Sequence, residues 1–201
     1  MSKLFLVAKG DQEDLKWVSK AVSTDSMRGF IGHVWYDREE GLLVATDGFR
    51  EHILNLKDTE HPRAILEKAL MDSTNESTFI DYKQGIITVH TASSEYEALG
   101  IYREFPNYKR VIPDIGKMEK DTDVLWPFSP KKDKKGTRIM DRTIGLLIAK
   151  YHIPLNPAYL YDMAQGSYYF SKARKEPEIH CVTLEDDTGR KAIIMPINPI
   201  Q

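Results

Sequence analysis

The sequence has 201 residues and only one cysteine, Cys181, so it excludes an intrachain disulfide. Chains without disulfides are typical of reducing compartments, and we expect a cytoplasmic protein in which Cys181 is a buried, inert thiol. Long hydrophobic runs are also missing. The apolar run near the N-terminus is short and is followed at once by charged residues, so neither a signal peptide nor a membrane span is expected.

An excess of positive charge is absent as well. The sequence carries 28 lysines and arginines against 30 aspartates and glutamates, a formal net charge of −2. It therefore lacks the simplest signature of a domain that grips nucleic acid. A chain that surrounds a duplex loosely needs positive charge only on the surface that faces the phosphates, so that role stays open.

Motifs of the common catalytic and cofactor sites are not present in the sequence. It contains no phosphate-binding loop, no G-x-S-x-G elbow and no dinucleotide fingerprint. The six histidines form no pair at the spacing of metal ligands, and none belongs to a cluster of cysteines or carboxylates in the sequence. We therefore expect a binding protein rather than an enzyme, with no catalytic residues, no metal and no cofactor.

Apolar periodicity and turn signals predict a repeated α+β pattern in the first half of the chain. A strand, a helix and three strands are followed by a second helix and three more strands. The expected ranges are 3–8, 11–23, 29–36, 41–46 and 49–56, then a helix that begins near Pro62 and strands at 78–82, 85–90 and 96–102. This recurrence suggests an internally duplicated domain over residues 1–115.

The composition changes after this domain. Residues 116–142 are rich in charge and contain prolines and glycines, which predicts a linker or long loop. Its basic run, residues 131–135, could contact phosphates or simply be solvated. A smaller module is expected over residues 143–201. Its expected elements are a strand at 144–151, a helix that begins at Asn156-Pro157 and ends near Gly166, and strands at 168–172, 178–185 and 191–196.

Three separated phrases carry a family resemblance. They are VATDGFR at residues 44–50, FPNYKRVIP at 105–113 and IIMPI at 193–197. The first resembles a hairpin in the middle domain of the bacterial beta sliding clamp, the second the segment that closes that domain, and the third the tail of the same family. The resemblance covers residues 3–113 as the middle domain and 143–201 as the second half of the last domain. It implies a DNA-clamp-like α+β fold of two modules.

In that family the three phrases form one groove that receives short linear motifs of polymerases and repair proteins. Carried over, the resemblance implies the following groove residues: Thr46, Gly48, Arg50, Pro106, Arg110, Val111, Ile193, Ile194, Met195, Pro196 and Ile197. Phe49 and Glu51 depart from the family pattern, and Glu51 would make the groove more acidic. For the hairpin, the alternative interpretation is a plain turn at Asp47-Gly48 with a solvated Arg50. For the tail, the alternative is an edge or core strand that ends at Pro196.

The resemblance also implies partners. These are duplex DNA bound weakly and without sequence preference, clamp-binding motifs of polymerases, and a clamp loader. Two modules per chain imply a ring of three copies, with Lys16 and Lys20 on a helix that faces its central hole. That helix face could equally be an ordinary solvated one. A second hypothesis is an adaptor or decoy derived from a clamp, which keeps the groove but forms no ring.

Overall fold

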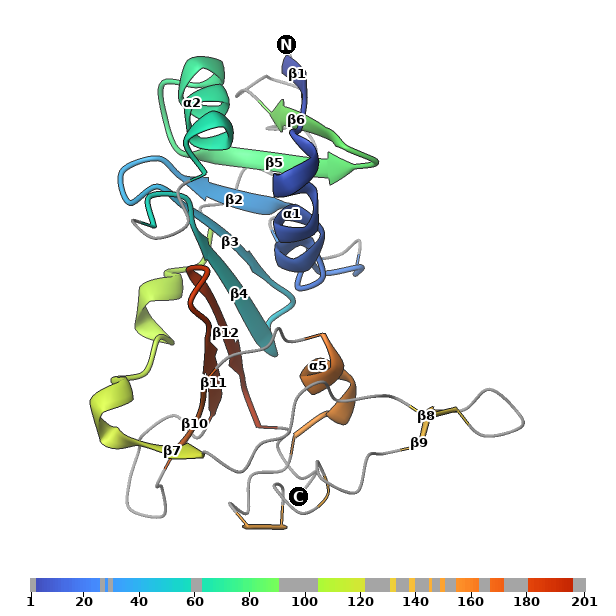
Figure 1. Cartoon of the computed structure of the whole chain (residues 1–201), viewed down its shortest axis with the longest axis vertical. Helices are drawn as coiled ribbons and strands as arrows, with labels where there is room; N and C mark the ends of the chain where they lie inside the picture. Colours follow the sequence, from blue (N-terminus) through green and yellow to red (C-terminus); the bar gives the residue numbers. More distant parts are fainter. Residues whose placement is uncertain are drawn as a thin grey trace.

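A computed structural model describes the chain over residues 3–25, 28, 31–58, 63–90, 105–121, 131–132, 138–139, 145, 149–150, 155–162, 167–171 and 181–196. Within these residues one antiparallel sheet of ten strands runs the length of the molecule, with helices packed beside it (Figure 1). The sheet and helices are an α+β architecture, as the sequence predicts.

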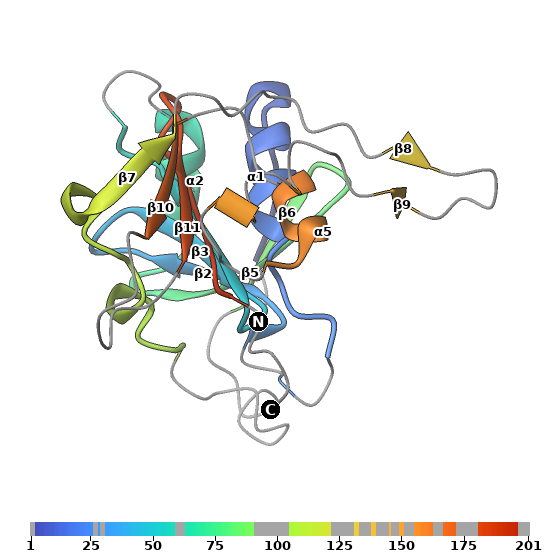
Figure 2. The same ribbon diagram turned by 90° about the horizontal axis from the view of Figure 1, so that it is seen from below.

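Strands from both halves of the sequence contribute to this sheet. Their order is β1-β6-β5-β2-β3-β4-β12-β11-β10-β7, and every neighbouring pair is antiparallel. The strands are β1 (Lys3–Leu6), β2 (Val34–Asp37), β3 (Leu42–Thr46), β4 (Arg50–Asn55), β5 (Thr78–Lys83), β6 (Ile86–His90), β7 (Met118–Asp121), β10 (Ser167–Ser171), β11 (Val182–Glu185) and β12 (Arg190–Ile194). A separate small hairpin pairs β8 (Lys131–Lys132) with β9 (Arg138–Ile139) and lies apart from the sheet (Figure 2).

Three of the α-helices that the structure describes pack on one face of the sheet. They are α1 (Gln12–Ser19), α2 (Ala64–Ser73) and α5 (Pro157–Tyr161), and their buried residues Leu15, Leu70 and Leu160 belong to one core cluster. The cluster also holds alternate residues of the central strands, because successive side chains of a strand point to opposite faces. The opposite face carries a second, smaller cluster that includes Val44, Ile53 and Phe79. We call these the helix face and the outer face.

Most predicted elements are present, with shifted ends. Asn156 caps α5 as expected, because its side-chain oxygen accepts a hydrogen bond of 3.0 Å from the backbone N–H of Ala158. The predicted strand at 144–151 is wrong, since residues 145, 149 and 150 are helical. A short apolar run does not distinguish a strand from a buried helix by periodicity alone. The helix expected to end near Gly166 ends at Tyr161 instead, with Asp162 as its C-cap. The strand expected at 96–102 lies outside the described residues.

The segment expected as a linker is not entirely irregular. Four of its residues form β7, which pairs with β10 at the edge of the sheet. The two predicted modules therefore share one sheet, and they meet where β4 pairs with β12. Figure 1 shows these two strands side by side at the centre of the molecule. Cys181 is fully buried, as expected.

A buried ion-pair network joins the same two halves on the helix face. Asp14 of α1 accepts a hydrogen bond of 2.5 Å from Arg63 Nε and one of 2.9 Å from Arg190 Nε. Arg63 also donates to the backbone oxygens of Asn55 and Thr188, at 3.0 and 2.7 Å. One carboxylate thus bridges two arginines, and the three side chains are at most 20% exposed.

Replacing Asp14 with Asn should destabilise the protein by about 3 kcal/mol or more, because it removes the carboxylate that pairs with the buried Arg63 and leaves Arg190 with Asp186 alone. Urea unfolding measures the change. The control is Glu40→Gln, which breaks the exposed pair with Lys109 and should change stability by less than about 1 kcal/mol. Equal effects of the two substitutions would show that the network does not hold the halves together.

Candidate functional site

The hairpin between β3 and β4 is held by its own side chains. The hydroxyl of Thr46 accepts from the Gly48 N–H at 3.0 Å and donates to the Arg50 carbonyl at 2.7 Å. Asp47 Oδ1 accepts from the backbone N–H groups of Phe49 and Arg50 at 2.9 and 3.0 Å. Gly48 has φ +89°, a conformation that favours glycine. The T-D-G sequence therefore fixes the turn locally.

The Arg50 side chain is held by ion pairs and hydrogen bonds within the molecule. Its guanidinium donates to Asp47 at 3.0 Å and to Asp162 at 2.7 Å, and also to the Lys20 carbonyl. It lies 4.6 Å from the centre of the Tyr159 ring. Arg50 thus ties the hairpin to the end of α1 and to α5, and its guanidinium is directed away from the outer face. The solvated alternative is therefore wrong for Arg50, whose side chain is 10% exposed, and its role in binding a peptide stays a prediction.

Aromatic stacking fixes the segment at the end of the first domain to the outer face. Phe105 stacks on Trp35 of β2 with ring centres 5.6 Å apart, and Phe79 lies beside both rings. Tyr108 is buried and donates a hydrogen bond of 2.8 Å to Asp37 Oδ2. These contacts bring residues 105–111 beside the hairpin, although about 60 residues separate the two segments in the sequence.

The C-terminal strand completes the arrangement. In the pairing of β12 with β4, Ile193 lies opposite Glu51, and the N–H of Met195 donates to the Phe49 carbonyl at 2.8 Å. Ile193 and Met195 therefore share the outer face with Glu51, whereas Ile194 belongs to the core on the helix face.

Together the three segments enclose a cavity of about 320 Å³ on the outer face, which we call the groove. This volume is at the lower end of the range for ligand sites. Its lining is mostly apolar, with few charged groups. The lining residues are Arg28, Ile31, Thr46, Gly48, Arg50, Glu51, Pro106, Asn107, Tyr108, Val111, Ile193 and Met195.

Seven of the implied groove residues line the groove, and their role in binding stays a prediction. These are Thr46, Gly48, Arg50, Pro106, Val111, Ile193 and Met195. Four do not line it within the described residues. Arg110 is exposed outside it, Ile194 is buried on the opposite face, Pro196 follows Met195 beyond the lining, and Ile197 lies outside the described residues.

Sequence reasoning missed several lining residues, namely Arg28, Ile31, Asn107 and Tyr108. Arg28 and Ile31 belong to the segment before β2, where no phrase resembles the family. Asn107 and Tyr108 belong to the FPNYKRVIP phrase and directly follow Pro106. Their position next to a predicted groove residue could have indicated that they line the groove. Arg28 lies at the rim, where its Nη1 donates to the Asp47 carbonyl at 3.4 Å.

The two lysines implied to face DNA are both exposed. Lys16 lies on α1. Lys20 caps the end of α1, and its Nζ is 3.6 Å from Asp162 Oδ1, so part of its charge is neutralised within the molecule. A DNA-facing role for the pair stays a prediction.

Glu51 is the unusual group of the groove. Its side chain is 4% exposed, and its Oε1 has no hydrogen-bond partner among the described residues. Burial raises the pKa of Glu51 from 4.5 to about 8, because the charged carboxylate loses its hydration. At neutral pH the protonated carboxyl therefore predominates, and it gives an apolar groove one strong hydrogen-bonding group.

Comparison with known proteins gives similarity to solved structures only. No protein-family model and no curated protein matches the sequence. The chain is similar to the sliding clamp of Caulobacter crescentus, with TM-score 0.48, 16% identity, and coverage of 98% of this chain and 66% of that one. It is also similar to the beta clamp of Helicobacter pylori bound to a DNA ligase peptide, with TM-score 0.42, 12% identity, and coverage of 98% and 66%.

A third similar structure is the sliding clamp (DNA polymerase III subunit beta) of Bartonella birtlesii bound to griselimycin, with TM-score 0.42, 13% identity, and the same coverage of 98% and 66%. The chain thus spans about two thirds of the length of these clamps, all of the class that its sequence phrases resemble.

Among the described helices, none has the length and apolar character that a membrane span requires.

Glu51 should make stability depend on pH. A carboxyl whose pKa is raised by folding binds its proton more tightly in the folded state, so the free energy of unfolding should fall as pH rises from 4.5 to about 8. The contribution of this one group is at most about 1.4 kcal/mol per pH unit. Glu51→Gln should remove it, so the stability of the variant relative to the parent should rise with pH in urea unfolding.

The control is Glu119→Gln, which replaces an exposed glutamate of β7. The free energy of unfolding of this variant should have the same pH dependence as that of the parent. If the stabilities of the Glu51→Gln variant and the parent depend on pH in the same way, folding does not raise the pKa of Glu51. The groove then holds no protonated carboxyl at neutral pH.

Proposed function

We propose that the chain is a non-catalytic, clamp-like processivity factor, and that the groove receives a short linear motif of a polymerase-type partner. The observation that carries this proposal is the convergence of three distant segments, residues 46–51, 106–111 and 193–195, on one mostly apolar cavity. An apolar slot with a few polar groups can hold an extended peptide, and a flexible methionine adapts its wall to the ligand.

In this proposal the partner is tethered to duplex DNA that the protein encircles or cradles in the cytoplasm. The tether would raise the effective concentration of the polymerase at its template, without a chemical step in this chain. Lys16 and Lys20 would contact phosphates weakly and with strong salt dependence. A clamp loader and a ring of three copies, closed by head-to-tail contacts, belong to the same proposal.

The second candidate is an adaptor or decoy that keeps the groove but forms no ring. Two observations favour it. Lys20 is paired with Asp162, and the net charge of the sequence is −2. Light scattering at micromolar concentration separates the candidates, because a ring needs an oligomer and a decoy does not. A mass of 23.1 kDa alone would favour the adaptor.

Glu51 indicates which peptides the groove would prefer. A protonated or charged carboxyl in an apolar cavity is stabilised by a ligand that brings a hydrogen-bond donor to it. A peptide that places an amide or ammonium group next to Glu51 should therefore bind more tightly than the same peptide with leucine at that position. Peptides with acidic flanks should bind least well.

Replacing Met195 with Ala should weaken the binding of a polymerase-derived motif peptide by about 1 kcal/mol or more, because truncation removes a wall of the groove. Fluorescence anisotropy with a panel of neutral, basic and acidic peptides measures the change. The matched control is Met71→Ala on α2, outside the groove, which should leave binding unaltered. Equal binding by the Met195→Ala variant and the parent would argue against the groove as the peptide site.

A further inference from the structure

Strand register brings two histidines and an aspartate together on the outer face, and none of the three is a lining residue of the groove. In the pairing of β2 with β5, Val34 lies opposite Ile80, so the preceding residue, His33, lies opposite Asp81. In the pairing of β5 with β6, Phe79 lies opposite His90, which places His90 diagonal to Asp81. Diagonal neighbours on one face are within reach of long side chains.

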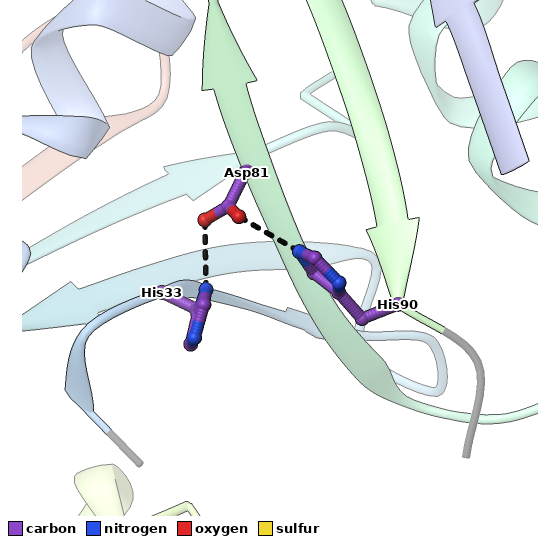
Figure 3. Close-up of side chains that lie close together, drawn as sticks. All are labelled: His33, Asp81 and His90. Atoms are coloured by element: carbon purple, nitrogen blue, oxygen red, sulfur yellow. Dashed lines mark hydrogen bonds and ion pairs between the residues drawn. The ribbon is translucent and has the colours of Figure 1, made fainter. Parts of the chain in front are cut away.

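The three side chains point toward one another (Figure 3). Asp81 Oδ1 is 2.7 Å from His33 Nδ1, and Asp81 Oδ2 is 2.8 Å from His90 Nε2. One donor atom from each of the three residues lies within 4.8 Å of the others. The imidazole ring centres are 5.1 Å apart, and Phe79 packs against the His33 ring.

We propose that His33, Asp81 and His90 form a binding site for a divalent first-row transition-metal ion of the Zn²⁺ class. The donor set of two imidazole nitrogens and one carboxylate oxygen is characteristic of such ions, whereas Mg²⁺ and Ca²⁺ prefer sites built mainly from oxygen. The site is independent of the peptide groove and of the proposed tethering function.

The chemistry of the three groups fits an ion. An ionised carboxylate only accepts hydrogen bonds, so His33 Nδ1 and His90 Nε2 both carry the protons directed at Asp81. Each carboxylate oxygen of Asp81 is already directed at one of the two imidazoles.

Metal binding needs only small movements. Donor atoms about 2.0–2.2 Å from a tetrahedral ion lie roughly 3.3–3.5 Å from each other, so the Asp81–imidazole separations would have to widen slightly. The ring protons would move to the other nitrogen of each imidazole or to solvent, which frees the lone pairs for the ion. The Asp81 side chain is 45% exposed, which gives an ion access from solvent.

Three protein donors leave a fourth position open to water or to a group of another molecule. A bound ion would link the residue before β2 to β5 and β6, at the end of the sheet where β1 forms the edge. Its expected effect is to stabilise this end of the sheet, because an ion that binds only the folded state raises stability by mass action.

Isothermal titration of the purified full chain with ZnCl₂ tests the proposal. The parent should show saturable binding of one Zn²⁺ ion at the cluster of each chain. Titration with MgCl₂ should show no saturable binding. Asp81→Asn and His90→Gln should each reduce Zn²⁺ affinity at least about tenfold, since even outer-sphere partners of a metal site are worth that much. The matched control is His180→Gln, which leaves all three side chains of the cluster in place and should bind as the parent does.

A second readout does not depend on the folding of any variant. Co²⁺ added to the parent should give visible absorption of a low-symmetry, nitrogen-ligated ion, and one equivalent of Zn²⁺ should abolish it. Absence of saturable Zn²⁺ binding and of this absorption in the parent would overturn the proposal and leave a hydrogen-bonded triad. Unchanged affinity in folded Asp81→Asn would overturn it as well. Peptide binding in the groove should be the same with and without Zn²⁺.

Discussion

The pairing of β4 with β12 is the constraint on which the rest of the structure depends. It joins two segments about 140 residues apart in the sequence, and it makes one sheet of strands from both halves of the chain. The register then decides which side chains meet. Because Ile193 is opposite Glu51 and Ile194 is opposite Arg50, the outer face receives Ile193 and the core receives Ile194. A slip of one residue would exchange these faces and remove the groove.

The two sides of β4 have opposite electrostatic character. On the helix face, Arg50 is neutralised by Asp47 and Asp162, so its charge is fully used in holding α1 and α5 against the hairpin. On the outer face, the neighbouring Glu51 has no such partner in the part of the chain that the structure describes. A buried group of this kind lowers stability, and a ligand that satisfies it recovers the loss. The groove therefore combines adaptable apolar walls with one polar group that discriminates between ligands.

Local sequence signals predicted the parts of the fold that local physics determines. The T-D-G turn, the Asn156 cap and the alternating strands of the first domain all follow from contacts within a few residues. Long-range register could not be predicted in this way. The direction of Arg50, the burial of Ile194 and the addition of β7 to the sheet edge each depend on which strands pair. The cluster of His33, Asp81 and His90 was missed for the same reason, since its members are not neighbours in the sequence.

The central claim is that three distant segments act as one peptide site, and hydrogen–deuterium exchange with and without a polymerase-derived peptide tests it most directly. The account predicts that the peptide slows exchange together in residues 46–51, 106–111 and 193–195, while α2 is unaffected. Slower exchange in only one of the three segments, or only elsewhere in the chain, would contradict it.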